Sequence, residues 1–206
     1  MPTSAVTADH LDRAFDYASY RQQIRDLLAE GKSTGTKQSE ALTKYSKLNE
    51  SRMKRLDKTY KPSEGIDKAV DSLSESWIWL VLTEGWCGDA AQNVPLMQKI
   101  AERSAGKIEL RLLLRDENLD LMDAYLTNGG RSIPKLICLR ATDHQELGTW
   151  GPRPAPVQEM VMAHKEKPEE DFATFAEKVH AWYARDKART FELELIRCMQ
   201  EWRDAE

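Results

Sequence analysis

The sequence predicts an α/β fold with a central mixed sheet flanked by helices, and the order of patterns in the middle of the chain carries this prediction. Between residues 63 and 167, short apolar runs of strand length alternate with segments of helical periodicity. Such alternation favours parallel strands joined by right-handed crossovers. The last two strand segments are separated only by a short polar turn, which adds an antiparallel pair. With 206 residues, the chain has room for one full domain and a substantial extension.

The N-terminal extension, residues 1–62, is expected to form a helical hairpin. Apolar residues recur at helical spacing over 9–30, and a second stripe runs from 42 to 60. The second helix is expected to end at Lys61-Pro62, because proline cannot continue a helix. Gly31-Lys32-Ser33, between the two helices, resembles the end of a phosphate-binding loop. No strand precedes it, so we interpret it as a turn.

The middle segment, residues 63–167, contains the predicted sheet. Ser63 is expected to cap a short helix, and the continuous apolar run 77–82 is typical of a central strand covered on both faces. The remaining elements follow from apolar periodicity and from the residues that punctuate it. They are a helix over 89–104, a strand over 108–114, a helix capped by Asn118 that ends at 128–130, strands over 135–140 and 146–150, and a helix after 152–156 that ends near His164.

The C-terminal extension, residues 168–206, is predicted to be a long helical stretch with a bend near 185–187. Its apolar stripe would be exposed if the stretch stood alone, and the same holds for the N-terminal hairpin. We therefore expect residues 9–60 and 171–203 to pack together as one helical layer against the sheet domain. Four residues should then be buried together, namely Tyr45, Leu48, Phe175 and Trp202.

Composition and charge argue against several classes of partner. The formal net charge of −4 gives no global positive field for nucleic acid or anionic lipid. The most apolar run, 77–82, is far shorter than the ~20 residues of a membrane-spanning helix. The first ten residues lack the basic and apolar regions of a secretory signal, so we expect a cytoplasmic protein.

The cysteines and histidines do not have the spacing of a disulfide framework or a metal site. The three cysteines, Cys87, Cys138 and Cys198, are far apart in the sequence, which fits reduced thiols in a cytoplasm. None of the four histidines forms an i,i+4 pair or neighbours a cysteine. We therefore expect no metal site and no cofactor.

Three short segments and one glycine stand at the ends of, or within, the predicted strands. Glu84-Gly85-Trp86-Cys87-Gly88-Asp89-Ala90 follows the central strand, and Arg115-Asp116-Glu117-Asn118 closes the next strand. Arg131-Ser132-Ile133-Pro134 precedes the first strand of the hairpin, and Gly148 falls in its second strand. In these features the chain resembles the thioredoxin-like superfamily, and in particular bacterial thioredoxin family proteins with a Trp-Cys-Gly-Asp-Ala site and extra helices. The resemblance implies a thioredoxin fold.

The resemblance also implies a site at the strand-to-helix corner. Cys87 would lie at the start of its helix, where unpaired N–H groups and the helix dipole stabilise a thiolate, and it would be partly exposed. A cis peptide bond before Pro134 would expose the backbone of Ile133 beside the sulfur, where thioredoxins pair with a substrate chain. Trp86 would form an apolar wall, and Gly88, Asp89 and Lys135 would complete the site.

The sequence departs from the thioredoxin pattern at positions whose side chains take part in, or influence, the thiol chemistry. Ala90 stands where the second, resolving cysteine belongs, so an internal dithiol cycle at this corner is excluded. Val81 stands where the family has a buried acid. Asp89 replaces a proline and has two opposing effects: its negative charge near the sulfur opposes thiolate formation, but it also favours the helix N-terminus. The sequence does not decide between them. Lys135 replaces a threonine and is expected to offset that charge.

Two functions fit these residues. In the first, the protein is a monothiol thiol-disulfide oxidoreductase in which Cys87 attacks a disulfide or a glutathione-type adduct, and an external thiol resolves the product. In the second, it is a non-catalytic thioredoxin-fold module that binds a protein partner. The expected partners are a protein or a low-molecular-weight thiol or disulfide, with a possible homodimer through the extra helices. A glutathione transferase fits less well, because its helical domain follows the fold and is larger than the tail here.

Overall fold

The computed structural model describes residues 4–204, and within them a four-stranded mixed sheet lies at the centre of the fold. Its strands are β1 (Trp77–Thr83), β2 (Ile108–Leu114), β3 (Lys135–Arg140) and β4 (Glu146–Trp150), in the order β2-β1-β3-β4. β1 pairs parallel with β2 and antiparallel with β3, and β4 pairs antiparallel with β3. The predicted α/β arrangement and its strands are confirmed.

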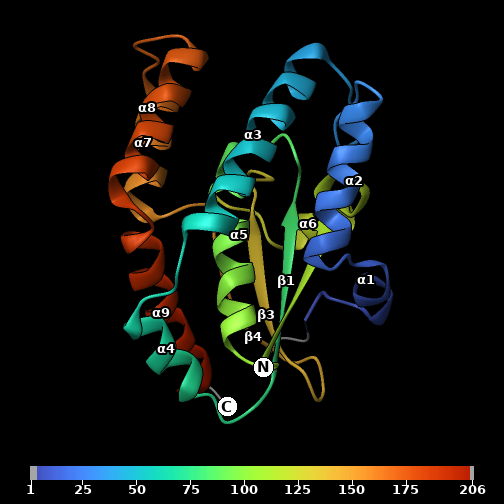
Figure 1. Ribbon diagram of the computed structural model, residues 1–206, viewed down its shortest axis with the longest axis vertical. Helices are drawn as coiled ribbons and strands as arrows, with labels where there is room; N and C mark the ends of the chain where they lie inside the picture. Colours follow the sequence, from blue (N-terminus) through green and yellow to red (C-terminus); the bar gives the residue numbers. More distant parts are fainter. Residues whose placement is uncertain (1–3, 205–206) are drawn as a thin grey trace.

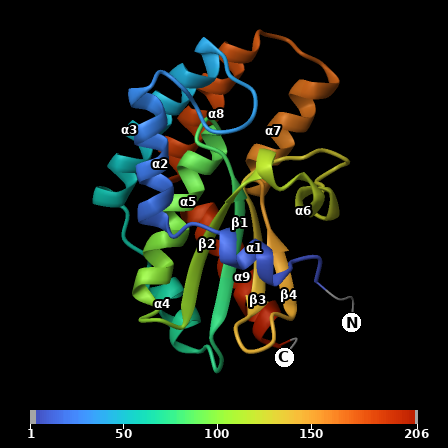
Figure 2. The same ribbon diagram turned by 90° about the vertical axis from the view of Figure 1, so that its right-hand side faces the viewer.

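Helices cover both faces of the sheet (Figure 2). In chain order they are α1 (Ala8–Arg13), α2 (Tyr17–Ala29), α3 (Glu40–Thr59), α4 (Glu64–Asp71), α5 (Gly88–Arg103), α6 (Leu119–Ala124), α7 (Ala155–Glu166), α8 (Phe172–Asp186) and α9 (Arg189–Asp204), with a short 3-10 turn η1 (Arg115–Glu117) before α6. No helix in the described part of the chain has both the length and the apolar character needed to cross a membrane.

β1 is the central strand, and every one of its seven residues is buried. This explains its continuous apolar sequence, since a strand covered on both faces has no solvent-facing positions. At its first residue, the ring of Trp77 meets that of Trp202 in α9 edge to face, with centroids 6.1 Å apart. The strand therefore joins the core of the sheet to the last helix of the chain.

The predicted first helix over 9–30 is wrong as a single helix, because the structure divides it into α1 and α2. Between them the backbone of Phe15 exchanges two 2.8 Å hydrogen bonds with Leu112 of β2. The carboxylate of Asp16 then accepts the N–H of Ser19 and caps α2. Helical spacing of apolar residues continues across the break, so the break could not be seen in the sequence.

Two further details differ from the sequence prediction. α6 ends at Ala124, several residues before the Asn-Gly-Gly turn, and Asn118 does not cap it with its side chain. The Asn118 amide instead donates to the carbonyl of Leu114, 2.7 Å away. The predicted bend in the last helical stretch is present as the separation of α8 from α9, with Lys187 in the left-handed conformation.

The two extensions do not form the single helical layer that we expected. The α2–α3 hairpin contacts α5 and β2, whereas α8 contacts α7, and α9 contacts β4 and α4. Figure 1 shows α2 and α3 at the centre and right, with α7, α8 and α9 at the left. Leu48 is 47% exposed, while Phe175 and Trp202 are buried. The extensions meet at few points, one being the Tyr60 hydroxyl, which donates to Glu192 of α9 over 2.6 Å.

The close approach of α9 to β4 depends on Gly148. A Cβ at this position would lie 2.0 Å from Nε1 of Trp202. We expect Gly148→Ala to lower the free energy of unfolding by about 1–3 kcal/mol, because the buried indole must move. Urea denaturation measures this loss. Gly130→Ala is the matched control, since the nearest atom to its Cβ would be 3.4 Å away. Equal stability of the two variants would contradict the proposed packing.

Candidate functional site

The corner between β1 and α5 places Cys87 at the N-cap of α5. Its sulfur accepts the backbone N–H of Ala90 at 3.4 Å, and its thiol donates to the carbonyl oxygen of Ile133 at 3.3 Å. The peptide bond between Ile133 and Pro134 is cis. Cys87 and the segment before β3 are thus in direct contact, although they come from distant parts of the sequence.

The state of the Cys87 thiol differs from the sequence expectation. Only 8% of the residue is exposed, so the predicted partial exposure is wrong. Burial, followed by the negative charge of Asp89, raises the pKa of the Cys87 thiol to about 12. The Ala90 N–H and the Arg153 guanidinium act in the opposite direction but are outweighed. At neutral pH the sulfur is therefore a protonated thiol and a weak nucleophile.

Asp89 is held by an ion pair that sequence reasoning missed. Nε of Arg153 donates to Oδ2 of Asp89 at 2.8 Å, and the side chains are only 12% and 14% exposed. The Tyr183 hydroxyl donates to Oδ1 at 2.8 Å and accepts the amide of Asn93 at 3.2 Å. Burial raises the pKa of Asp89, against the opposing effect of Arg153 and Tyr183. The signal available in the sequence was Arg153 itself, a lone charge in the proline-rich segment before α7.

Lys135 does not offset the charge of Asp89, as the sequence had suggested. It is 7% exposed, and burial lowers the pKa of its ammonium group. No carboxylate among residues 4–204 forms an ion pair with it. The cation that forms an ion pair with Asp89 is therefore Arg153, which is distant in the sequence.

Glu84 supplies a buried acid near the corner, although the thioredoxin position for that acid is occupied by Val81. The Glu84 residue is fully buried, and its carboxyl group accepts hydrogen bonds from the Thr34 hydroxyl and from the N–H of Asp116 at 2.9 Å. Burial raises the pKa of Glu84 to about 7, despite the lowering effect of these hydrogen bonds. Thr34 also accepts the N–H of Gly85 at 2.8 Å. The loop between α2 and α3 therefore holds the corner in place.

A cavity of about 500 Å³ opens beside the thiol, and we call it the Cys87 cavity. The β1–α5 corner, α3, α7 and α8 all contribute to it. Its lining residues are Leu42, Tyr45, Trp86, Cys87, Gly88, Asp89, Ser132, Arg153, Val161, His164, Lys165, Phe172, Phe175, Ala176, Val179 and His180. Four predicted site residues, Trp86 to Asp89, thus line one cavity. Ile133, Pro134 and Lys135 are buried and do not line it.

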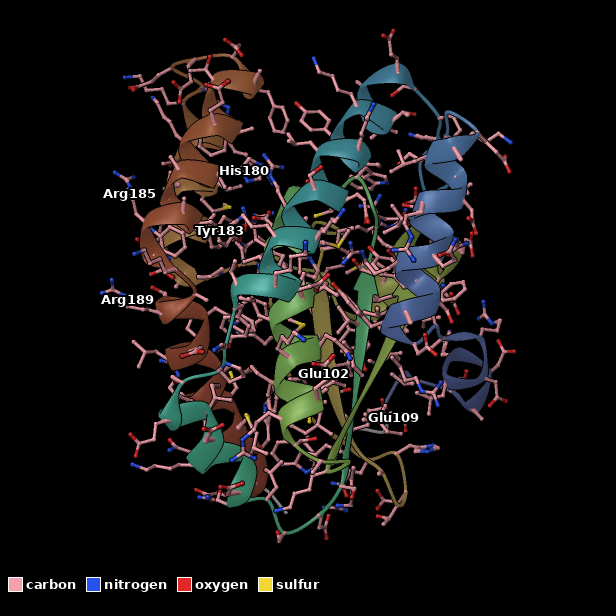
Figure 3. The ribbon with its side chains drawn as sticks, viewed as in Figure 1. Glu102, Glu109, His180, Tyr183, Arg185 and Arg189 are labelled. Atoms are coloured by element: carbon pink, nitrogen blue, oxygen red, sulfur yellow. The ribbon has the colours of Figure 1, made fainter. Side chains whose placement is uncertain are left out.

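Two histidines of the cavity wall were absent from the predicted site. His180 lies against Gly88, where a Cβ would be 2.9 Å from its Cε1 atom. Burial lowers the pKa of His180 to about 4, and the charge of Arg52 contributes, so the ring is neutral. The ring of His164 stacks on Phe175 with centroids 4.0 Å apart. Figure 3 shows His180 and Tyr183 on the inner side of α8, toward α3 and α5.

Trp86 is held against the edge of the cavity by a cation. The guanidinium of Arg115 lies over its ring, 4.9 Å from the centroid, and also pairs with Asp116 at 2.6 Å. The ring is therefore fixed and presents an apolar surface.

The described residues offer no metal site. Residues 4–204 contain no group of three His, Cys, Asp or Glu side chains that could hold an ion.

Asp89→Asn removes the charge that raises the pKa of Cys87. We expect iodoacetamide to alkylate Cys87 about fivefold faster at pH 8.5 in this variant, because the thiolate becomes less unfavourable. Peptide mass spectrometry separates this labelling from that of Cys138 and Cys198. Asp9→Asn, at an exposed site on α1, is the control and should behave as the wild type. A slower reaction in Asp89→Asn would show that Asp89 does not oppose the thiolate.

The raised pKa of Glu84 makes stability depend on pH. Its folded-state pKa of about 7 exceeds the ordinary value of 4.5, so the folded form binds the proton more tightly. The free energy of unfolding should therefore fall as pH rises from 4.5 to about 7, by up to about 3 kcal/mol. Urea denaturation at pH 5 and 7.5 should show this fall in the wild type and in Glu159→Gln, an exposed control. If the free energy of unfolding of Glu84→Gln falls by the same amount between pH 5 and 7.5, the pH dependence belongs to another group.

Comparisons with known proteins agree with this architecture. The thioredoxin family model matches residues 35–170, a span that includes α3 and α7 of the cavity wall as well as the sheet. A protein of unknown function from Pseudomonas aeruginosa is similar in structure, with a TM-score of 0.61, 16% identity, and coverage of 95% of this chain and 98% of that one. An HIV epitope scaffold has a TM-score of 0.52 and 14% identity, with coverage of 98% and 97%.

At these identities the two structures support the fold alone. No curated protein matches the chain. The family match extends over well more than half of the residues, and the sheet has the strand order and directions described above. The chain therefore has a thioredoxin-like α/β fold and belongs to the thioredoxin family.

Proposed function

We propose that this protein is a non-catalytic binding protein whose ligand occupies the Cys87 cavity. The observation that carries the proposal is the cavity itself, about 500 Å³ in volume and walled by three helices over a buried, protonated thiol. This volume is within the range of small-molecule sites in proteins, ~300–1,000 Å³. A ligand there would contact Cys87 without requiring it to react.

The same geometry favours a small ligand over a protein chain. In thioredoxins a substrate chain pairs with the backbone before the cis-proline, but here Ile133 and Pro134 are buried. The carbonyl of Ile133 already accepts the Cys87 thiol. A peptide would have to displace this hydrogen bond and the covering residues. A low-molecular-weight partner needs no such change.

Monothiol oxidoreductase activity is the second candidate, and one observation favours it. The Cys87 sulfur caps α5 and lines the cavity, so a disulfide that entered the cavity would meet it directly. The thiolate would attack one sulfur, form a mixed disulfide and release the other half as a thiolate. An external thiol would then resolve the product, because Ala90 replaces the second cysteine. The raised pKa of Cys87 opposes the first step.

The two candidates differ in what they require of Cys87. Incubation with 2-hydroxyethyl disulfide at pH 7.5, followed by intact-mass measurement, should leave a binding protein unmodified. Rapid formation of a mixed disulfide at Cys87 would instead support the oxidoreductase. The cytoplasmic location and a homodimer through the extra helices stay predictions.

Filling the cavity should weaken ligand binding. Ala176 lines the cavity, whereas Ala181 is exposed on the same helix. We expect the apolar dye N-phenyl-1-naphthylamine to bind the wild type with saturable fluorescence, and Ala176→Trp to weaken binding about tenfold or more. Ala181→Trp is the matched control and should bind normally. Failure of the dye to bind the wild type, or equal binding by the two tryptophan variants, would refute the proposed site.

A further inference from the structure

The interior of the Cys87 cavity offers no unpaired charge. Asp89 and Arg153 neutralise each other at 2.8 Å, and both are largely buried. The Cys87 thiol is protonated and His180 is neutral. Lys165, the other cation of the lining, is exposed near the end of α7. A charged ligand inside the cavity would lose hydration without gaining a buried counter-charge, so the cavity favours an uncharged one.

The walls of the cavity are aromatic, and part of this surface faces solvent. Phe172 is 65% exposed, although it lies at the start of α8 and lines the cavity. The rings of Phe175 and His164, both in the cavity lining, stack face to face. Trp86 is held by Arg115 at the edge. A ligand with a flat apolar body would bury this surface and stack on the rings.

His180 is a lining residue of the cavity, and one of its ring nitrogens, Nε2, lies beside Gly88 at the corner. The amide nitrogen of Gln92 lies 3.4 Å from Nδ1 of His180 and can only donate, so Nδ1 is the acceptor. In the neutral ring the proton is then on Nε2. Nε2 faces Gly88, at 3.1 Å from where a Cβ would stand, and no residue among 4–204 accepts a hydrogen bond from it. The site therefore has one open donor next to Cys87.

We infer that the Cys87 cavity takes an uncharged, flat apolar molecule with a carbonyl-type acceptor, and that this acceptor receives the Nε2–H of His180. The aromatic walls would bind the body of the molecule, and His180 would fix the position of its polar end beside the thiol. Gly88 is then required, because a side chain there would fill the space of the imidazole. This inference rests on the proposed function, since it names the ligand class of the same cavity.

A pair of dyes tests the role of His180. 6-Propionyl-2-dimethylaminonaphthalene is an uncharged naphthalene with a ketone, whereas N-phenyl-1-naphthylamine has no carbonyl. We expect the ketone dye to bind the wild type with saturable, blue-shifted emission. His180→Phe should weaken its binding about three- to tenfold, the usual effect of losing one hydrogen bond. Binding of N-phenyl-1-naphthylamine should stay within about twofold, which shows that the cavity is intact.

Two further measurements complete the test. His180→Gln retains an N–H donor and should recover most of the ketone affinity. The anionic dye 8-anilinonaphthalene-1-sulfonate should bind the wild type about tenfold more weakly than the ketone. Equal weakening of both neutral dyes by His180→Phe, no weakening, or tight binding of the anion would overturn this inference alone. If neither neutral dye binds the wild type, the proposed function fails and this inference fails with it.

Discussion

The ion pair between Asp89 and Arg153 connects the parts of the molecule that form the cavity. Asp89 lies in the first turn of α5, and Arg153 lies in the segment that leads into α7. Tyr183 extends the contact to α8 through its hydroxyl. Because both charges are largely removed from water, loss of either partner would leave the other unpaired at a cost of about 3–5 kcal/mol. The positions of α7 and α8 over the thiol thus depend on this pair.

The other side of the β1–α5 corner is held by hydrogen bonds to the Glu84 carboxyl group and to the backbone of Gly85. Thr34 contacts both Glu84 and Gly85, and Asn49 of α3 donates to the Gly85 carbonyl at 3.0 Å. Both contacts come from the N-terminal hairpin, which therefore is part of the site rather than a separate appendage. The family match begins within this region, at residue 35. Residues of α3 and α8, which belong to the helical extensions, form part of the wall of the Cys87 cavity.

The reactivity of Cys87 depends on its surroundings as well as on its position at the N-cap of α5. A cysteine at a helix N-terminus gains thiolate stability from N–H groups and the dipole, and Ala90 N–H provides such a contact. Burial and the neighbouring Asp89 charge nevertheless raise the pKa to about 12. Desolvation removes more stabilisation from the thiolate than the helix end restores. The result is a neutral polar group in an apolar cavity, which suits binding better than exchange.

The sequence by itself determined the sheet and the location of the site. The apolar run of β1 and the turns that bound β3 and β4 are local signals, since they depend on period and punctuation within a few residues. The segment Trp86 to Asp89 indicated the corner through its resemblance to the thioredoxin-like superfamily. Only the tertiary structure decided the break at Phe15, the partner of Asp89, the burial of Glu84 and the state of Cys87. Each of these depends on residues far away in the sequence and on exclusion of water, as with Arg153, which meets Asp89 only because the segment before α7 returns to the start of α5.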